Sequence, residues 1–177
     1  ILDICDSLIV SGTTNTAGVV NQSVISGRYN NVSATDYSFI GGSGNTTSVV
    51  DGSIVVGNSN FLSNCTGTIV TGVLNACSSS FNGIFGVQNF CSGTGNLMGG
   101  NLNVCAGSHN IISGETNTIS TLGEYSIVGG HLNSCTGFGH VVGGWRNTVF
   151  DVYAAVFGNL NYVDSRNSII GGVWDSL

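Results

Sequence analysis

Acidic and amide side chains recur at 15-residue intervals near the N-terminus, at Asp6, Asn21, Asp36 and Asp51. If residues 15 apart lie on adjacent turns of a repeat, Asp36 and Asp51 are close neighbours. Two carboxylates so placed could form the catalytic pair of a retaining glycosidase, or bind Ca²⁺ together with backbone carbonyls. Short polar residues at corners more commonly form Asx turns. The turn is the favoured interpretation, and the ion site and the catalytic pair are the second and third alternatives.

Cysteine and histidine are the other residues that could bind a metal or act as nucleophiles. Four cysteines share one repeat position with Val, Ile and Leu, which predicts small buried apolar side chains; they are Cys77, Cys91, Cys105 and Cys135. Cys5 and Cys65 occupy another position and are expected at an exposed corner. The sequence has no CxxC pair and no Cys/His cluster, so zinc is not expected.

The three histidines fall at different repeat positions, so they do not form the convergent set that a metal or an activated nucleophile needs. We expect His109, His131 and His140 at the surface or at corners. The sequence therefore predicts no catalytic residue, no metal site and no cofactor.

Aromatic and arginine side chains are the better candidates for binding. They directly follow a glycine that recurs along the chain, or lie one residue further on. The residue type there changes from repeat to repeat, and a repeat protein can vary its surface at such a position. The candidate binding residues are Arg28, Tyr29, His131, Trp145, Arg146 and Trp174. They could contact a sugar or a protein, or only fill an oligomer interface.

All these residues are placed by a repeat that runs through the chain. Each copy has a small polar residue, two apolar residues, a glycine corner and an asparagine, as in Ser126 to Asn133. The reference glycine of each copy is Gly12, Gly27, Gly42, Gly57, Gly72, Gly86, Gly100, Gly114, Gly130, Gly144, Gly158 or Gly172, at steps of 14 to 16 residues. Such a period predicts a solenoid, and repeats this short predict one turn of a parallel β-roll each.

Two apolar columns precede the reference glycines. Val128 and its equivalents stand two residues before it, and Ile127 and its equivalents stand three residues before it. Because neighbouring strand residues point to opposite faces, both faces are expected to be covered, one by the roll and one by other chains. Where the second column is small, at Gly83 and Ala155, a phenylalanine follows two residues later. This compensation suits a packed interior, so we assign the Ile127 column to the interior and the Val128 column to partner chains.

Asparagine recurs three residues after the reference glycine. The column consists of Asn15, Asn30, Asn45, Asn60, Asn75, Asn89, Asn103, Asn117, Asn133, Asn147 and Asn161, and Asp175 ends it. Stacked amides can donate to one neighbour and accept from the other, which predicts a structural ladder. The alternative is that asparagine only tolerates the turn after glycine.

Composition narrows the class of protein. The chain has 28 glycines, no proline, 41% hydrophobic residues and a net charge of −6. It therefore lacks the basic surface that nucleic acid requires, and no run reaches the roughly 20 apolar residues that span a membrane. We expect one β-solenoid domain over residues 1–177, with repeats from about residue 7 to 175, as a segment of a longer fibre.

The repeat S-x-I/V-x-G-x-x-N, as in Ser38 to Asn45 and Ser168 to Gly172, resembles the YadA-like head repeats of trimeric autotransporter adhesins and related repeats of phage and viral fibre proteins. The resemblance covers nearly the whole chain. It implies a left-handed parallel β-roll of about twelve turns and a homotrimer. It also implies attachment to a cell-surface glycan or protein receptor, without enzyme activity.

The cysteines distinguish the two kinds of protein in this resemblance. Exported adhesins tend to avoid cysteine, which oxidises during export, so six cysteines favour a virion tail fibre over an adhesin head. The expected location of the protein is the surface of a virion or of a cell. Two alternatives stay open: an ice-binding solenoid and a carbohydrate-active β-helix. The first needs a regular threonine array, but the position after the ladder asparagine reads Thr16, Asn31, Thr46, Phe61, Ala76, Phe90.

Overall fold

The computed structural model describes residues 5–174 and 176, and the chain divides into two compact units, Ile1–Gln88 and Asn89–Leu177. Each unit is an all-β parallel solenoid, and together they contain about eleven turns of about 14 residues. The predicted all-β parallel solenoid is confirmed. The predicted twelve turns become about eleven, because twelve repeated strands enclose only eleven complete turns. No helix in the described part of the chain is long and apolar enough to cross a membrane.

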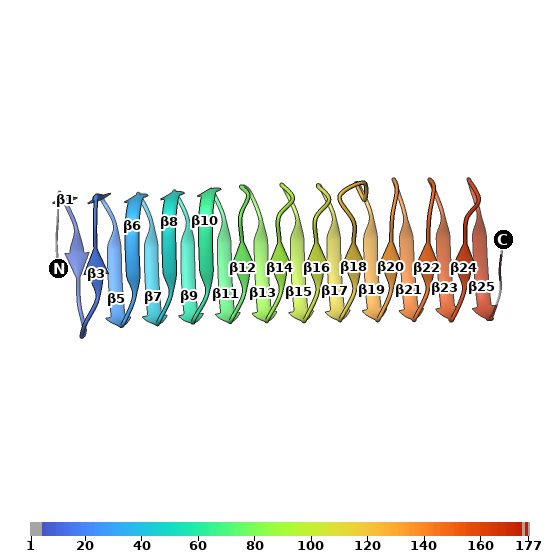
Figure 1. Ribbon diagram of the computed structural model, residues 1–177, viewed down its shortest axis with the longest axis horizontal. Coiled ribbons are helices and arrows are strands. Elements are labelled where there is room, and N and C mark those ends of the chain that lie inside the picture. Colours follow the sequence, from blue (N-terminus) through green and yellow to red (C-terminus); the bar gives the residue numbers. More distant parts are fainter. Residues whose placement is uncertain (1–4, 175, 177) are drawn as a thin grey trace. The chain divides into compact units, whose positions relative to one another are not determined.

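The first unit has two parallel sheets, whose strands lie side by side along it (Figure 1). Its first sheet consists, in spatial order, of β2 (Ile9–Val10), β5 (Val24–Arg28), β7 (Phe39–Ser43), β9 (Ile54–Asn58), β11 (Ile69–Val73) and β13 (Gly83–Val87). Its second sheet consists of β1 (Cys5–Asp6), β4 (Val20–Asn21), β6 (Asn31–Asp36), β8 (Thr46–Asp51), β10 (Phe61–Thr66) and β12 (Ala76–Cys77), and β3 (Thr16–Ala17) also pairs with β6.

The second unit repeats the arrangement. Its first sheet consists of β15 (Leu97–Asn101), β17 (Ile111–Glu115), β19 (Ile127–His131), β21 (Val141–Trp145), β23 (Ala155–Asn159) and β25 (Ile169–Val173). Its second sheet consists of β14 (Phe90–Cys91), β16 (Val104–Cys105), β18 (Thr118–Ile119), β20 (Ser134–Cys135), β22 (Thr148–Val149) and β24 (Tyr162–Val163).

The register of the strands follows the sequence period. Val24 pairs with Phe39, 15 residues later, whereas Leu97 pairs with Ile111, 14 residues later. Three of the 15-residue turns have six-residue second strands, and one of these, β8, contributes two buried side chains, Thr47 and Val50. Most of the shorter turns have two-residue second strands followed by a tight turn. In these three turns the extra residue lengthens the second strand and leaves the first sheet in register.

The two apolar columns of the first sheet are assigned the wrong way round by the sequence argument. Val128 is 1% exposed and lies in the interior, whereas Ile127 is 50% exposed on the outer face. The other turns follow the same pattern, with Ile112 at 1% and Ile111 at 46%. Strand alternation is correct, but the volume compensation that led to the assignment takes place on the outer face. The phenylalanines that replace the lost volume, Phe85 and Phe157, are therefore exposed as well.

Candidate functional site

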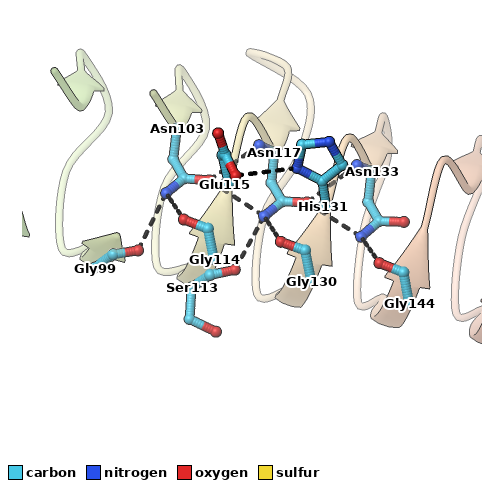
Figure 2. Close-up of polar contacts among 10 residues, drawn as sticks. All are labelled: Gly99, Asn103, Ser113, Gly114, Glu115, Asn117, Gly130, His131, Asn133 and Gly144. Atoms are coloured by element: carbon cyan, nitrogen blue, oxygen red, sulfur yellow. Dashed lines mark hydrogen bonds and ion pairs between the residues drawn. The ribbon is translucent and has the colours of Figure 1, made fainter. Parts of the chain in front are cut away.

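The asparagine column forms a hydrogen-bonded ladder in each unit, and Figure 2 shows three of its members in the second unit. Asn117 donates through Nδ2 to Asn103 Oδ1 (3.2 Å) and to the carbonyl oxygens of Ser113 and Gly130 (both 2.9 Å). Its Oδ1 accepts from the backbone N–H (3.0 Å) and Nδ2 (3.1 Å) of Asn133. Each amide thus binds the preceding turn, its own turn and the following turn. These contacts make the column a structural element rather than a reaction site.

The ladder has the same geometry in both units. Side-chain bonds of 3.0 to 3.2 Å link, in order, Asn15, Asn30, Asn45, Asn60 and Asn75 in the first unit, and Asn89, Asn103, Asn117, Asn133, Asn147 and Asn161 in the second. Asp175, which ends the column in the sequence, lies outside the described residues. Every ladder asparagine except Asn15 is buried.

A second ladder, which the sequence argument missed, runs four residues before the reference glycines. Ser38 N–H donates to Ser23 Oγ and Ser53 N–H to Ser38 Oγ (both 3.1 Å). In the second unit Asn110 Oδ1 accepts from Ser126 N–H (2.8 Å), and Ser126 Oγ accepts from His140 N–H (3.1 Å). The polar residue that begins each repeat was its signal in the sequence.

His140 belongs to this second ladder and is fully buried, so the expectation of a surface or corner position is wrong. Its Nδ1 accepts from the Ala154 N–H (3.3 Å), which places the proton on Nε2, where it donates to the Thr136 carbonyl oxygen (3.2 Å). Burial lowers the pKa of His140, while the nearby Asp151 charge opposes this shift. The imidazole is therefore neutral and structural at pH 7.

The cysteines of the second strand point inward, as predicted, and Cys77, Cys91, Cys105 and Cys135 are buried thiols that form no disulfide. Burial raises the pKa of Cys135 to about 12. The expectation that Cys65 lies at an exposed corner is wrong, because its side chain is only 1% exposed. Its thiol donates to the carbonyl oxygens of Ser63 (3.3 Å) and Cys77 (3.4 Å). A hydrogen bond with the Cys77 side chain and burial raise the pKa of Cys65, so this thiol is not a nucleophile at neutral pH.

The Asp and Asn column of the first unit bonds to backbone at the corners. Asn21 Oδ1 accepts from the Asp6 N–H (3.3 Å), and Asp36 Oδ1 accepts from the Asn21 N–H (3.1 Å). Asp36 and Asp51 pair in register on β6 and β8. Among the described residues, no three His, Cys, Asp or Glu side chains are grouped so that they could hold a metal ion. The observed role of this column is to bridge corners of successive turns.

Three of the predicted binding residues come together at one corner of the second unit, which we call the corner patch and define as Glu115, His131, Trp145 and Arg146. Glu115, His131 and Trp145 end three successive strands and pair in register. His131 Nδ1 lies 3.5 Å from Glu115 Oε2, and both side chains are partly exposed (Figure 2). The Arg146 guanidinium carbon lies 4.7 Å from the Trp145 ring centroid, within cation–π range.

The remaining candidates lie elsewhere. Arg28 and Tyr29 belong to the first unit, where Tyr29 is 61% exposed. Trp174 is 77% exposed and lies two turns beyond Arg146, with Leu160 at the equivalent position between them. Tyr29, Arg146 and Trp174 all have left-handed backbone, with φ between 54° and 67°. Nearly every repeat has this conformation at the same position, so it belongs to the corner and is not a mark of function.

Comparison with known proteins identifies no family for this chain. No family model and no curated protein matches the chain. A solved structure described as an acetyltransferase from Desulfovibrio desulfuricans G20 is 8% identical with a TM-score of 0.25, and the match covers 99% of this chain and 68% of that one. UDP-N-acetylglucosamine acyltransferase from Campylobacter jejuni is 9% identical with a TM-score of 0.25, over 93% of this chain and 64% of that one. The Moraxella catarrhalis RH4 UDP-N-acetylglucosamine O-acyltransferase is 12% identical with a TM-score of 0.23, over 94% and 70%.

Proposed function

We propose that this chain is a structural and adhesive segment of a homotrimeric fibre, a virion tail fibre or a surface adhesin head, whose turns wind left-handed as in the YadA-like heads that the repeat resembles. It attaches the fibre to a glycan or protein receptor and does not catalyse a reaction. The supporting observation is an exposed apolar face that no part of the described chain covers.

This face is the apolar stripe, which we define as the large side chains three residues before the reference glycines. They are Ile9, Phe39, Ile54 and Ile69 in the first unit, and Leu97, Ile111, Ile127, Val141 and Ile169 in the second, with exposed fractions of 40% to 84%. They present on the order of 400 Å² in each unit, within the roughly 300–600 Å² of the largest patch on a typical monomer. Each unit therefore supplies about half of the ~800 Å² per partner of a stable interface.

The composition of the stripe favours a second and third copy as its cover. The stripe column carries no charged residue, so a contact there sets no like charges directly against each other, although each chain has a net charge of −6. A symmetric assembly then repeats the same contact at every turn. The corner patch lies at the last residue of these strands and just beyond it, at the opposite end of each strand from the stripe, so it stays available to a receptor.

The mass of the protein in dilute solution tests this proposal. We expect three times the mass of one chain by light scattering, and loss of association in the double variant Ile111→Thr, Ile127→Thr. Thr118→Ile is the matched control, because it changes an exposed position of the second sheet and should leave the trimer intact. A folded wild-type monomer would refute the proposal.

Attachment is tested separately on the corner patch. Trp145→Ala and Arg146→Ala should each weaken adhesion to the receptor-bearing surface at least tenfold without changing the mass, because aromatic and arginine side chains dominate such contacts. Asn159→Ala, an exposed neighbour of Trp145 on the next turn, is the control that should leave adhesion unchanged. Equal adhesion by all three variants would remove the corner patch from the proposal.

A further inference from the structure

The outer face of the first sheet shows a compensation of side-chain size within single turns. Most turns place a large residue in the apolar stripe and Gly, Ser or Thr two residues later on the same face, such as Ile127 with Gly129. Two turns reverse this order, with Gly83 before Phe85 in the first unit and Ala155 before Phe157 in the second. Both phenylalanines are exposed, at 40% and 51%. A face open to water has no reason to conserve volume turn by turn.

Phe157 does not fill the space beside Ala155 in its own chain. A hollow of about 330 Å³ lies over Ala155, bounded by Val141, Ile169 and Tyr153 among others, and the Phe157 ring is not part of its wall. The ring instead leans over Gly143 of the preceding turn, where a β-carbon would lie 3.3 Å from it. The chain therefore presents a hollow and a knob side by side on the same strand, β23.

Symmetry identifies what can fill the hollow. Rotation about an axis parallel to the solenoid keeps each turn at its own height, so the turn of Ala155 meets the same turn of the next copy. The large exposed side chain of that turn on this face is Phe157. An antiparallel dimer would instead bring a different turn to this height. A small and a large residue within the same turn would then not face each other across the contact.

We infer that the partner of the apolar stripe is a parallel, unstaggered copy of this chain, in which Phe157 of one copy inserts into the hollow over Ala155 of the next. This inference rests on the proposed self-association, and it adds the direction, the register and the two columns that meet. The reversed turns then act as a registration device, because sliding by one turn would set Phe157 against the large residue Val141 or Ile169.

A double-mutant cycle tests the inference with residues that the repeat already tolerates. Ala155→Ile blocks the hollow, Phe157→Gly removes the knob, and the double variant recreates the pattern of the turns at Ile127 and Ile169. Each single variant should raise the dissociation constant of the assembly at least about tenfold, and the double variant should return it to within about threefold of wild type. Circular dichroism of each variant confirms that it is folded.

The outcomes separate this inference from the proposed function. A wild-type monomer would overturn both. An associating wild type whose two substitutions have additive effects would overturn only the knob-in-hollow contact and leave the trimer standing. Phe61→Ala, at an exposed position of the second sheet, is the control for loss of an exposed aromatic ring, and it should leave the dissociation constant unchanged.

Discussion

At the residue scale, the same repeat position accepts chemically different side chains if each supplies the same hydrogen bond. Ser126 and His140 both accept a backbone N–H from the next turn, through Oγ and Nδ1 respectively. A column of unlike residues is thus a single ladder. The sequence could predict the asparagine ladder because its column is uniform, but it could not place His140, since a lone histidine carries no sign of burial.

Acid should destabilise the fold through His140. The pKa of His140 is lowered below 6.5 by burial, so the unfolded chain binds a proton that the folded chain excludes as pH falls below 6.5. The contribution of His140 to the free energy of unfolding is therefore fully present at pH 7 and is lost toward pH 5. The loss from this one group is at most about 1.4 kcal/mol per pH unit. Protonation of Nδ1 would also oppose its bond with the Ala154 N–H.

Urea unfolding at pH 7 and pH 5 measures this effect. His140→Asn is the matched control, because Asn96 and Asn110 occupy the same column and bond in the same ladder. The variant should lose less stability than wild type over this pH range, since acidic groups such as Asp151 are common to both. Equal losses would show that His140 stays neutral in the unfolded chain or is charged in the fold.

At the element scale, the strand and its corner are fixed by close approach of backbones. Gly114 has φ of +103°, and a β-carbon built there would overlap the carbonyl oxygen of Gly130 on the next turn. The recurrent glycine therefore follows from stacking, and its period could be predicted from the sequence. Which side of each strand faces inward could not, because alternation defines two faces without saying which is the interior, and both are apolar here.

Loss of one ladder amide should cost far more than loss of an exposed one. Asn117→Ala leaves the carbonyl oxygens of Ser113 and Gly130 and the N–H of Asn133 without their side-chain partner in a buried space. We expect a loss of about 2–4 kcal/mol, since each unsatisfied buried group costs about 1–3 kcal/mol and relaxation recovers part of it. Asn159→Ala, at an exposed position, should change the free energy of unfolding by less than about 0.5 kcal/mol. Comparable losses of the free energy of unfolding in the two variants would show that the ladder hydrogen bonds of Asn117 do not stabilise the fold.

At the scale of the whole molecule, the exposed stripe and the charge distribution act against each other. The chain has nine acidic residues, three arginines and no lysine, with a net charge of −6, and the arginine at position 166 is already paired with Asp151 at 3.1 Å. Association of identical chains therefore brings together like net charges, while the stripe contributes apolar burial. The sequence reveals the net charge and the apolar column, but only the structure shows that the stripe residues lie on the exposed outer face of the sheet.

Salt should therefore strengthen the proposed assembly. Raising ionic strength from roughly 0.01 M to 0.1 M shortens the Debye length from about 30 Å to about 10 Å, which screens repulsion between chains and leaves apolar burial intact. The dissociation constant, measured by sedimentation or light scattering, should fall by severalfold over this range. If salt weakened association, ion pairs rather than the apolar stripe would hold the copies together. The Ile111→Thr, Ile127→Thr variant separates these cases, because it should remain dissociated at both salt concentrations only if apolar contacts dominate.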